Sequence, residues 1–467
     1  MLKRSISIAM AFVGIIVGAG FASGQEALQF FVAFGQWGVV GAVIAGVLMA
    51  VTAMIVLKFG SYFLAGEHTA VFDRVTHPIV ARVLDYGIMA TLFSVGFVMF
   101  AGAGANLQQQ FGLPMWVGAL LMLGLVIATG FLDVDRVSQV IGIATPFIIF
   151  FLVLAMVFSL RDAPSDLSTL QPYADSVQTT LPNWWVACLN YLGFNMIVAA
   201  SMSIVIGGSQ YDTKAAGWGG LFGGLIFAFL LVGLVLSLWV ALPVVSHEDM
   251  PTLALVNNVN PLLGNVMAVV IYAMIYNTAI GMFYSMSRRL TANKPHRFRV
   301  VYIAMALVGF VLSFVGFKTL VSALYPLLGY VGVMLIATLI AAYLRGRTRI
   351  NAEIERRETM RTLVSRMLNP ATVFTRRHAR KLRIVAEQSP VSNEELREAV
   401  LLEVADELAA DDNVDFTDEQ AAKLREKLAE EAEQNLKEAA AKTADSSKDD
   451  EERPDNETGS TRPLALH

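Results

Sequence analysis

Residues 11–31 read AFVGIIVGAGFASGQEALQFF, an apolar run that is broken up partway along. The interruptions are four glycines and two polar residues: Gly14, Gly18, Gly20, Gly24, Gln25 and Glu26. Glycine is a poor helix former, and a carboxylate in hydrocarbon is costly. The stretch therefore predicts a membrane helix that breaks near its middle. The alternative is close helix packing, because glycines spaced four apart let two helices approach each other.

The composition of the chain indicates a membrane protein. Of its 467 residues, 55% are hydrophobic and only 16% are charged, against about 25% charged in a typical soluble protein. The charges concentrate from Arg345 onward, so the formal net charge of −4 averages two unlike regions. The single cysteine, Cys188, excludes a disulfide framework, and we expect it to be a packing residue.

Ten segments are long and apolar enough to cross a bilayer as helices, which takes about 20 residues each. They are roughly 5–33, 37–58, 79–105, 113–131, 137–160, 183–207, 215–242, 262–287, 299–316 and 319–344. None shows the alternation of a barrel strand. With a cytoplasmic N-terminus, Lys and Arg fall almost entirely in inner loops, and only Arg161 and Lys318 lie outside. We therefore expect a plasma-membrane protein with both termini in the cytoplasm.

The first break is expected at mid-membrane, because about thirteen residues at about 1.5 Å each separate Ser5 from Gly18. Backbone groups freed there must line a cavity or bind something. The second half-helix would offer N–H groups to a carboxylate, and the first would offer carbonyls to a cation.

Five spans later, residues 183–208 read NWWVACLNYLGFNMIVAASMSIVIGG, where Asn190, Gly193 and Asn195 predict a second break at similar depth. Paired interruptions in two halves of a chain are typical of a transporter site. Five helices per half would also make the halves inverted repeats, over 5–160 and 183–344.

Two motifs carry a family resemblance. GIIVGAGFASG (14–24) resembles the first-helix motif of the amino acid–polyamine–organocation (APC) superfamily, and YLGFN (191–195) resembles its sixth-helix motif. The whole pattern over residues 5–344 is similar to the bacterial YkvI-like membrane proteins. The resemblance implies a LeuT-type fold: an all-α membrane protein of ten helices, arranged as a 5+5 inverted repeat with helices 1 and 6 broken.

The resemblance also implies a solute site between the two breaks. A solute carboxylate would meet the amides of Ala19, Gly20 and Phe21, and the sixth helix would complete the pocket. Asn195 departs from the motif, which carries an acid there in many relatives. The implied solute-binding residues are Gly18, Ala19, Gly20, Phe21, Glu26, Tyr191, Gly193, Phe194 and Asn195.

The role of Glu26 has two interpretations of equal weight. It binds a solute amine or carries a coupling proton, or it is a structural acid that caps the second half-helix. Gln25 is expected to be structural. The resemblance further implies a sodium site, formed by the carbonyls of Gly14 and Val17 with Asn277 and Thr278. The coupling ion is therefore sodium or a proton, and no other cofactor is expected.

The other polar residues are expected to have structural roles. Asp85 lies three residues after Arg82, which is helical spacing for a local ion pair. All six histidines fall in loops or in the tail, and no HExxH, Walker or nucleophile motif is present. We therefore expect no enzyme.

The C-terminal region divides into a basic juxtamembrane helical segment (345–390), an acidic helical segment (391–445) and a disordered end (446–467). Capping-box spacing at Ser392 with Glu395, and at Thr417 with Gln420, predicts two helix starts. The segment is a regulator, a site for a cytoplasmic partner, or an accessory domain.

These features together predict a secondary active transporter of a small amino-acid-like or amine solute. An ion gradient would drive it by alternating access, with the lipid bilayer as surroundings and no nucleic-acid partner. The alternative is a transporter-shaped sensor or scaffold that acts through its tail, and a channel is a weaker third. The sequence carries no indication of the oligomeric state.

Overall fold

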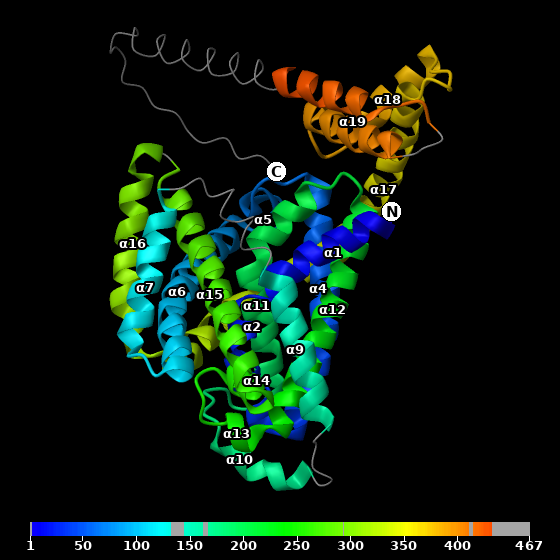
Figure 1. Ribbon diagram of the computed structural model, residues 1–467. Coiled ribbons are helices and arrows are strands. Elements are labelled where there is room, and N and C mark those ends of the chain that lie inside the picture. Colours follow the sequence, from blue (N-terminus) through cyan, green and yellow to red (C-terminus); the bar gives the residue numbers. More distant parts are fainter. Residues whose placement is uncertain (1, 132–143, 162–166, 293, 411–413, 432–467) are drawn as a thin grey trace, which may run out of the picture. The chain divides into compact units, whose positions relative to one another are not determined.

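Helices make up the secondary structure of this computed structural model, which describes residues 2–131, 144–161, 167–292, 294–410 and 414–431 and contains no strand within them (Figure 1). The chain divides into two compact units, Met1–Glu355 and Arg356–His467. The longest helix, α17 (Phe317–Leu368), begins in the first unit and continues into the second.

The first unit contains most of the helices. Before the middle of the chain these are α1 (Leu2–Ile16), α2 (Ala19–Ser23), α3 (Gln25–Phe30), η1 (Val32–Phe34), α4 (Gln36–Phe63), α5 (His68–Val75), α6 (Pro78–Phe111), α7 (Met115–Thr129), α9 (Ala144–Arg161), η2 (Leu167–Leu170) and α10 (Gln171–Ser176). After it come α11 (Trp184–Gly208), α12 (Thr213–Val240), α13 (Leu242–Val245), α14 (Pro251–Val259), α15 (Pro261–Leu290), η3 (Pro295–Arg297), α16 (Phe298–Leu312), η4 (Ser313–Val315) and α17.

Seven helical segments among the described residues are long and apolar enough to cross a membrane. They are α4, α6, α11, α12, α15, Phe298–Val315 and α17. Met115–Thr129 and Ile149–Ser159 are apolar but shorter, and the first predicted span is divided into α1, α2 and α3. Residues 137–143 of the fifth predicted span lie outside the described residues. The structure thus agrees with a multi-pass helical membrane protein, and the count of ten spans stays a prediction.

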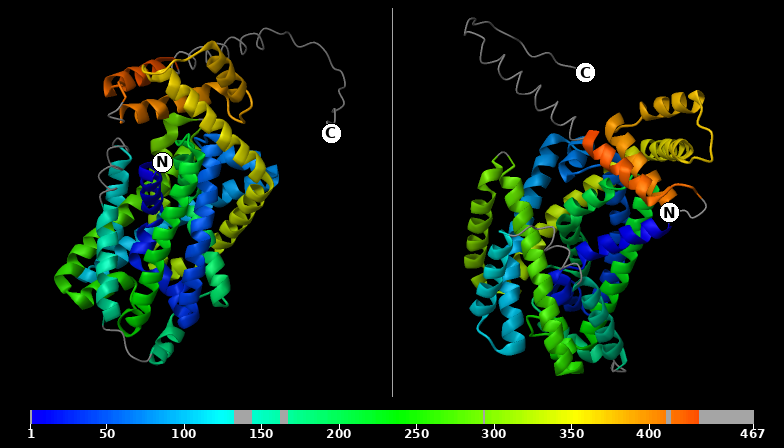
Figure 2. Two further views of the ribbon diagram at one scale, coloured as in Figure 1. Left: turned by 90° about the vertical axis from the view of Figure 1, so that its right-hand side faces the viewer. Right: turned by 45° about the horizontal axis from the view of Figure 1, so that its top comes forward.

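The long helices pack in two groups (Figure 2). The first, called here the α4 bundle, contains α1, α4, α11 and α12. The second, the α6 bundle, contains α6, α7, α15 and α16. Small residues bring the backbones together in the α4 bundle: methyls built on Gly220 and Gly224 of α12 would collide with Ala53 and Ala50 of α4. Such contacts suit a membrane, where lipid offers no hydrophobic drive for helix association.

The predicted break in the sixth helix is wrong, because α11 runs without interruption from Trp184 to Gly208. Its glycine instead allows contact with α17: a methyl on Gly193 would overlap with the backbone at Gly329 and Gly332. The two asparagines, Asn190 and Asn195, hydrogen-bond to helix carbonyls. Asn190 Nδ2 donates to the Pro326 carbonyl of α17 at 2.8 Å, and Asn195 Nδ2 donates to the Tyr191 carbonyl, one turn earlier, at 3.1 Å.

Pro326 lies inside α17 without ending it. Proline has no N–H, so the carbonyl of Ser322, four residues earlier, loses its intrahelical donor. The Thr180 hydroxyl supplies a replacement and donates to this carbonyl at 2.7 Å. A side chain from a distant loop therefore satisfies a backbone group that the helix cannot.

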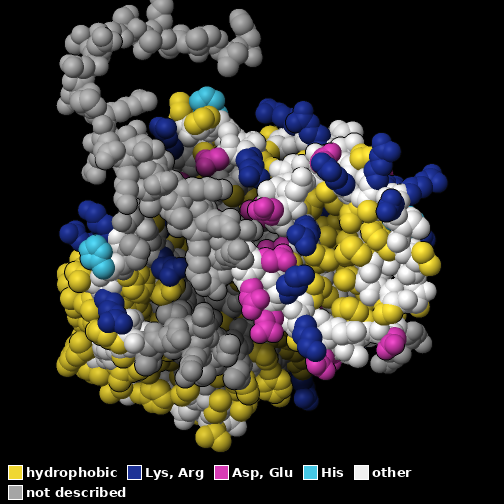
Figure 3. Space-filling model, turned by 90° about the horizontal axis from the view of Figure 1, so that it is seen from above, with side chains coloured by type: hydrophobic (Ala, Val, Ile, Leu, Met, Phe, Trp, Pro, Cys, Tyr) yellow, Lys and Arg dark blue, Asp and Glu magenta, His cyan; other side chains and the backbone are white. Residues whose placement is uncertain are grey.

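The second unit contains the end of α17, α18 (Arg376–Ala386), α19 (Asn393–Ala409) and a helix over residues 418–431. The capping box at Thr417 and Gln420 is formed, whereas at Ser392 only the hydroxyl bond from the Glu395 N–H is present. Arg361 pairs with Glu407 across the unit, and basic and acidic side chains lie near one another in the view from above (Figure 3). The predicted end at 446–467 lies outside the described residues.

Gly193→Ala should destabilise the protein, because the methyl has no room against the backbone of α17. Overpacking of this kind costs about 1–3 kcal/mol, and we expect a lower unfolding temperature in detergent. The matched control is Gly124→Ala on α7, where a methyl would meet nothing within 4 Å. Equal unfolding temperatures for the two variants would contradict the proposed helix contact.

Candidate functional site

The first helix breaks where its glycines predict. Helix α1 ends at Ile16, and the Gly18 N–H turns back to the Ile16 carbonyl at 2.8 Å rather than continuing the helical ladder. As a result, the carbonyls of Gly14 and Val17 receive no backbone hydrogen bond from the described residues. The prediction of a break at mid-helix is confirmed by these bonds.

A second turn follows at Gly24, whose φ of 78° lies in the left-handed region that favours glycine. Ser23 stabilises this turn with two hydrogen bonds. Its hydroxyl donates to the Gly20 carbonyl at 2.7 Å and accepts from the Gln25 N–H at 3.2 Å. Thr252 of α14 donates to the Ala22 carbonyl, and its methyl would lie 2.8 Å from a side chain at Gly24. The turn thus has its shape fixed by α14 as well as by its own residues.

Glu26 lies in the first turn of α3, and its side chain reaches back over α2. Its carboxylate occupies the space that a methyl on Gly20 would fill. The residue is only 5% exposed, and within the described part of the chain its carboxylate has no ion pair or hydrogen bond. The expected capping bonds from the amides of the second half-helix are therefore not seen, while the carboxylate does lie at the predicted break.

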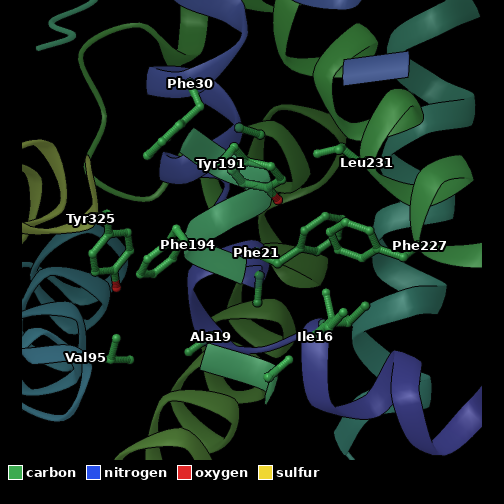
Figure 4. Close-up of a cluster of buried hydrophobic side chains, with 14 of the residues drawn as sticks. Ile16, Ala19, Phe21, Phe30, Val95, Tyr191, Phe194, Phe227, Leu231 and Tyr325 are labelled. Carbon is green, nitrogen blue, oxygen red and sulfur yellow. The ribbon is translucent and has the colours of Figure 1, made fainter. Parts of the chain in front are cut away.

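Aromatic rings from several helices lie around the break between Ile16 and Ala19 (Figure 4). Phe21 packs against Phe227 of α12 with ring centroids 5.3 Å apart. Phe194 of α11 stacks on Tyr325 of α17 at 4.1 Å. Tyr191 of α11 makes edge contacts with two phenylalanines: Phe30 at 5.5 Å and Phe31 at 4.8 Å.

Several buried polar atoms of this region have no partner among the described residues. Both side-chain amide atoms of Gln25, which precedes Glu26, are buried without a hydrogen bond, and so is the hydroxyl of Tyr325. The Tyr191 hydroxyl has the Asn195 side chain as its neighbour. Both phenols are near enough to Glu26 for its charge to act on them. Buried polar groups are normally hydrogen-bonded, so this cluster is a candidate binding centre.

The structure brings most of the predicted solute-binding residues together. Gly18, Ala19, Gly20, Phe21 and Glu26 lie at the break, and Tyr191 and Phe194 face it from α11. Gly193 packs against α17, as described above, and the Asn195 side chain bonds the Tyr191 carbonyl and lies beside the Tyr191 hydroxyl. Sequence reasoning missed Phe227 and Tyr325, which come from distant helices, and it treated Gln25 as structural.

The predicted sodium ligands are partly adjacent. The Thr278 hydroxyl of α15 lies 3.7 Å from a methyl built on Gly18, at the break. No comparable contact with the break places Asn277 there. Among the described residues no group of three or more His, Cys, Asp or Glu side chains is arranged to hold a metal ion.

A second polar cluster lies at the end of the helices where α15 terminates. Arg289 of α15 donates to both carboxylate oxygens of Asp85 on α6 at 2.9 Å. His68 joins them, with Nε2 3.3 Å from Asp85 and Nδ1 3.0 Å from the Ser201 hydroxyl of α11. The predicted local pair of Asp85 with Arg82 is therefore wrong, because a guanidinium from another helix occupies both carboxylate oxygens.

Comparison with known proteins gives relatives but no matching family model. The chain is 24% identical over 336 residues to the membrane protein YkvI of Bacillus subtilis (strain 168), covering 71% of this chain and 94% of YkvI. The predicted resemblance to YkvI is confirmed. Protein YyaD of the same organism is 25% identical over 340 residues and is covered to the same extents, 71% and 94%.

Solved structures of other proteins are also similar to this chain. The inward-facing conformation of Mhp1 is similar with a TM-score of 0.46 and 14% identity, over 90% of this chain and 94% of that one. The Eremococcus coleocola manganese transporter, in complex with an aromatic bis-isothiourea substituted compound, has a TM-score of 0.44 and 13% identity, with 87% of each chain covered.

The stability of the protein should depend on pH through His68. Burial lowers the pKa of its imidazole below the usual value of 6.5, a shift that the hydrogen bond accepted by Asp85 opposes. The folded protein therefore favours neutral His68, whereas the unfolded chain binds a proton below about pH 6.5. The stability that depends on neutral His68 is present above that pH and is lost as the pH falls toward the lower folded pKa.

We expect the wild type to lose more stability than His68→Gln between pH 7.5 and 5.5. Thermal unfolding of both proteins across this range measures how the difference in stability between them changes with pH. The part of this difference that does not change with pH reports the hydrogen bonds lost in His68→Gln. A difference that does not change with pH would contradict the assignment.

Proposed function

We propose that this protein is a secondary active transporter of a small amino-acid-like or amine solute. The solute binds at the break of the first helix and is moved by alternating access. The observation that carries this proposal is the carboxylate of Glu26, which lies at the break among aromatic rings without a cation from the described chain. An unpaired intramembrane carboxylate is costly, and it suits a ligand ammonium group or a transported proton.

The aromatic shell suits the same ligand class. Phe21, Tyr191 and Phe194 present ring surfaces close to the break, and ring faces attract organic cations. The unpaired side-chain amide of Gln25 and the unpaired phenol of Tyr325 add donors and acceptors for a solute with more than one polar group. This combination favours an amino-acid-like or amine solute over an apolar one.

The packing of the helices supports alternating access. Helix α1 packs on α12, while α11 packs on α4, so the first helix of each predicted half contacts the second helix of the other. This exchange is what an internal inverted repeat of helices 1–5 and 6–10 would produce. The α4 bundle would then rock against the α6 bundle around the solute.

The coupling ion is sodium or a proton. Sodium would bind the free carbonyls of Gly14 and Val17 with the Thr278 hydroxyl, since hard cations prefer oxygen ligands. A proton would be carried by Glu26. The loop charges favour the plasma membrane with both termini in the cytoplasm, so the end that carries His68 and Arg289 would be the cytoplasmic side.

Ligand-induced thermal stabilisation of the purified full-length protein tests this proposal. A panel of amino acids and amines is screened in sodium and in potassium, at pH 6 and pH 8. A saturating solute should add about 2.7 kcal/mol of stability at a hundredfold excess over its Kd. Glu26→Gln should weaken binding of the solute at least tenfold, and the exposed-acid control Asp73→Asn should not.

The same solute should then enter proteoliposomes that contain the protein. A requirement for sodium that Thr278→Ala removes would identify the sodium route, whereas dependence on pH alone would identify Glu26 as the proton carrier. Unchanged binding and uptake in Glu26→Gln would overturn the proposed site.

A sensor or scaffold is the second candidate, and the second unit favours it because it has a core of its own. Helix α19 buries one face, formed by Leu396, Val400, Leu401, Val404, Ala405 and Leu408. This candidate predicts saturable binding without net uptake in proteoliposomes. Uptake that follows binding would exclude it as the main function.

A further inference from the structure

A cavity of about 470 Å³ opens between α5, α6, α11 and α15, at the end of the helices where α15 terminates. Its size is in the range of pockets that hold small ligands, roughly 300–1,000 Å³. The cluster of His68, Asp85 and Arg289 forms part of its wall, and Phe298 of α16 contributes an apolar surface. The residues at the first-helix break do not line it.

One face of α15 supplies the cavity with unused hydrogen-bond donors. Tyr284, Ser285 and Arg288 all line it and lie within about one turn of the same helix. The Arg288 guanidinium lies 5.8 Å from the centre of the Tyr284 ring, and no carboxylate of the described chain pairs with it. Neither hydroxyl has a hydrogen bond to another described residue. A cation with two neighbouring hydroxyls is a suitable receptor for an anion.

Arg289, next to Arg288, is already paired, so Arg288 is the arginine of this cavity that can bind a ligand. Arg289 makes two bonds to Asp85, and its other edge lies 3.8 Å from Glu67. Two acids and two arginines thus line the cavity, which leaves the lining near neutrality. A ligand with several negative charges would be repelled by Glu67 and Asp85, whereas a single carboxylate can pair with Arg288.

We propose that this cavity is a binding site, separate from the first-helix break, for a small monocarboxylate held by Arg288, Tyr284 and Ser285. The ligand carboxylate accepts hydrogen bonds from the guanidinium and the two hydroxyls. An amino group on the ligand would be tolerated, because Glu67 and Asp85 lie in the same lining. Amino acids and simple keto acids both belong to this class.

Binding to the full-length protein tests the site with three probes at pH 7 and constant ionic strength: L-alanine, pyruvate and ethylamine. Ethylamine matches L-alanine but has no carboxylate. We expect saturable thermal stabilisation by L-alanine or pyruvate and none that depends on Arg288 by ethylamine. Arg288→Gln should weaken carboxylate binding at least tenfold, and Tyr284→Phe, which keeps the ring, should weaken it by a smaller factor.

Arg82→Gln is the matched control, since Arg82 lies on α6 near Asp85 but does not line the cavity. It should bind the probes as the wild type does. The unfolding temperature without ligand shows whether each variant is folded, and Arg288 is exposed enough for its replacement to be tolerated. Failure of both carboxylates to stabilise the wild type, or equal affinity in Arg288→Gln, would overturn the site.

Glu26→Gln separates this inference from the proposed transport site. Binding that survives Glu26→Gln and is lost in Arg288→Gln supports the cavity, whether or not transport is observed. Binding lost in Glu26→Gln and kept in Arg288→Gln overturns the cavity and leaves the central site intact. If the bound carboxylate is also taken up by proteoliposomes, its source is the transported solute; if not, it is a separate cytosolic ligand.

Discussion

The structure around the first helix depends on one contact, between the carboxylate of Glu26 and the bare Cα of Gly20. A side chain at residue 20 would occupy the place of the carboxylate. Gly24 allows the left-handed turn that brings α3 back toward α2, so that Glu26 can reach this position. The glycine-rich stretch therefore interrupts the helix and also makes room for the buried carboxylate of Glu26.

Backbone groups at membrane depth need partners, and the rest of the fold shows where they are supplied. Ser23 and Thr252 bond the carbonyls freed at the second turn, and Thr180 replaces the donor that Pro326 lacks. These repairs stabilise the irregular backbone. Other polar groups have no partner among the described residues: the backbone carbonyls of Gly14 and Val17, and the side-chain amide of Gln25. The two carbonyls lie at the break, which is why we assign binding to it.

Sequence reasoning located the first break because glycine and a buried acid leave strong local signals. It failed for α11, where Gly193 carries the same signal for a different cause: the glycine meets the backbone of a helix more than a hundred residues later. Likewise, local spacing suggested Arg82 as the partner of Asp85, while the real partner, Arg289, comes from α15. Phe227 and Tyr325 lie at the site because of similar long-range packing. Sequence periodicity and motifs do not predict such contacts between distant helices.

The most direct measurement of the central claim compares solute binding by wild type and Gly20→Ala, with Gly281→Ala on α15 as the control. A methyl at Gly281 meets nothing within 4 Å, whereas one at Gly20 displaces the Glu26 carboxylate. We predict that Gly20→Ala folds, as shown by its unfolding temperature, but binds the solute found in the amino acid and amine screen at least tenfold more weakly. Wild-type affinity in folded Gly20→Ala would contradict the claim that the solute binds beside the carboxylate of Glu26.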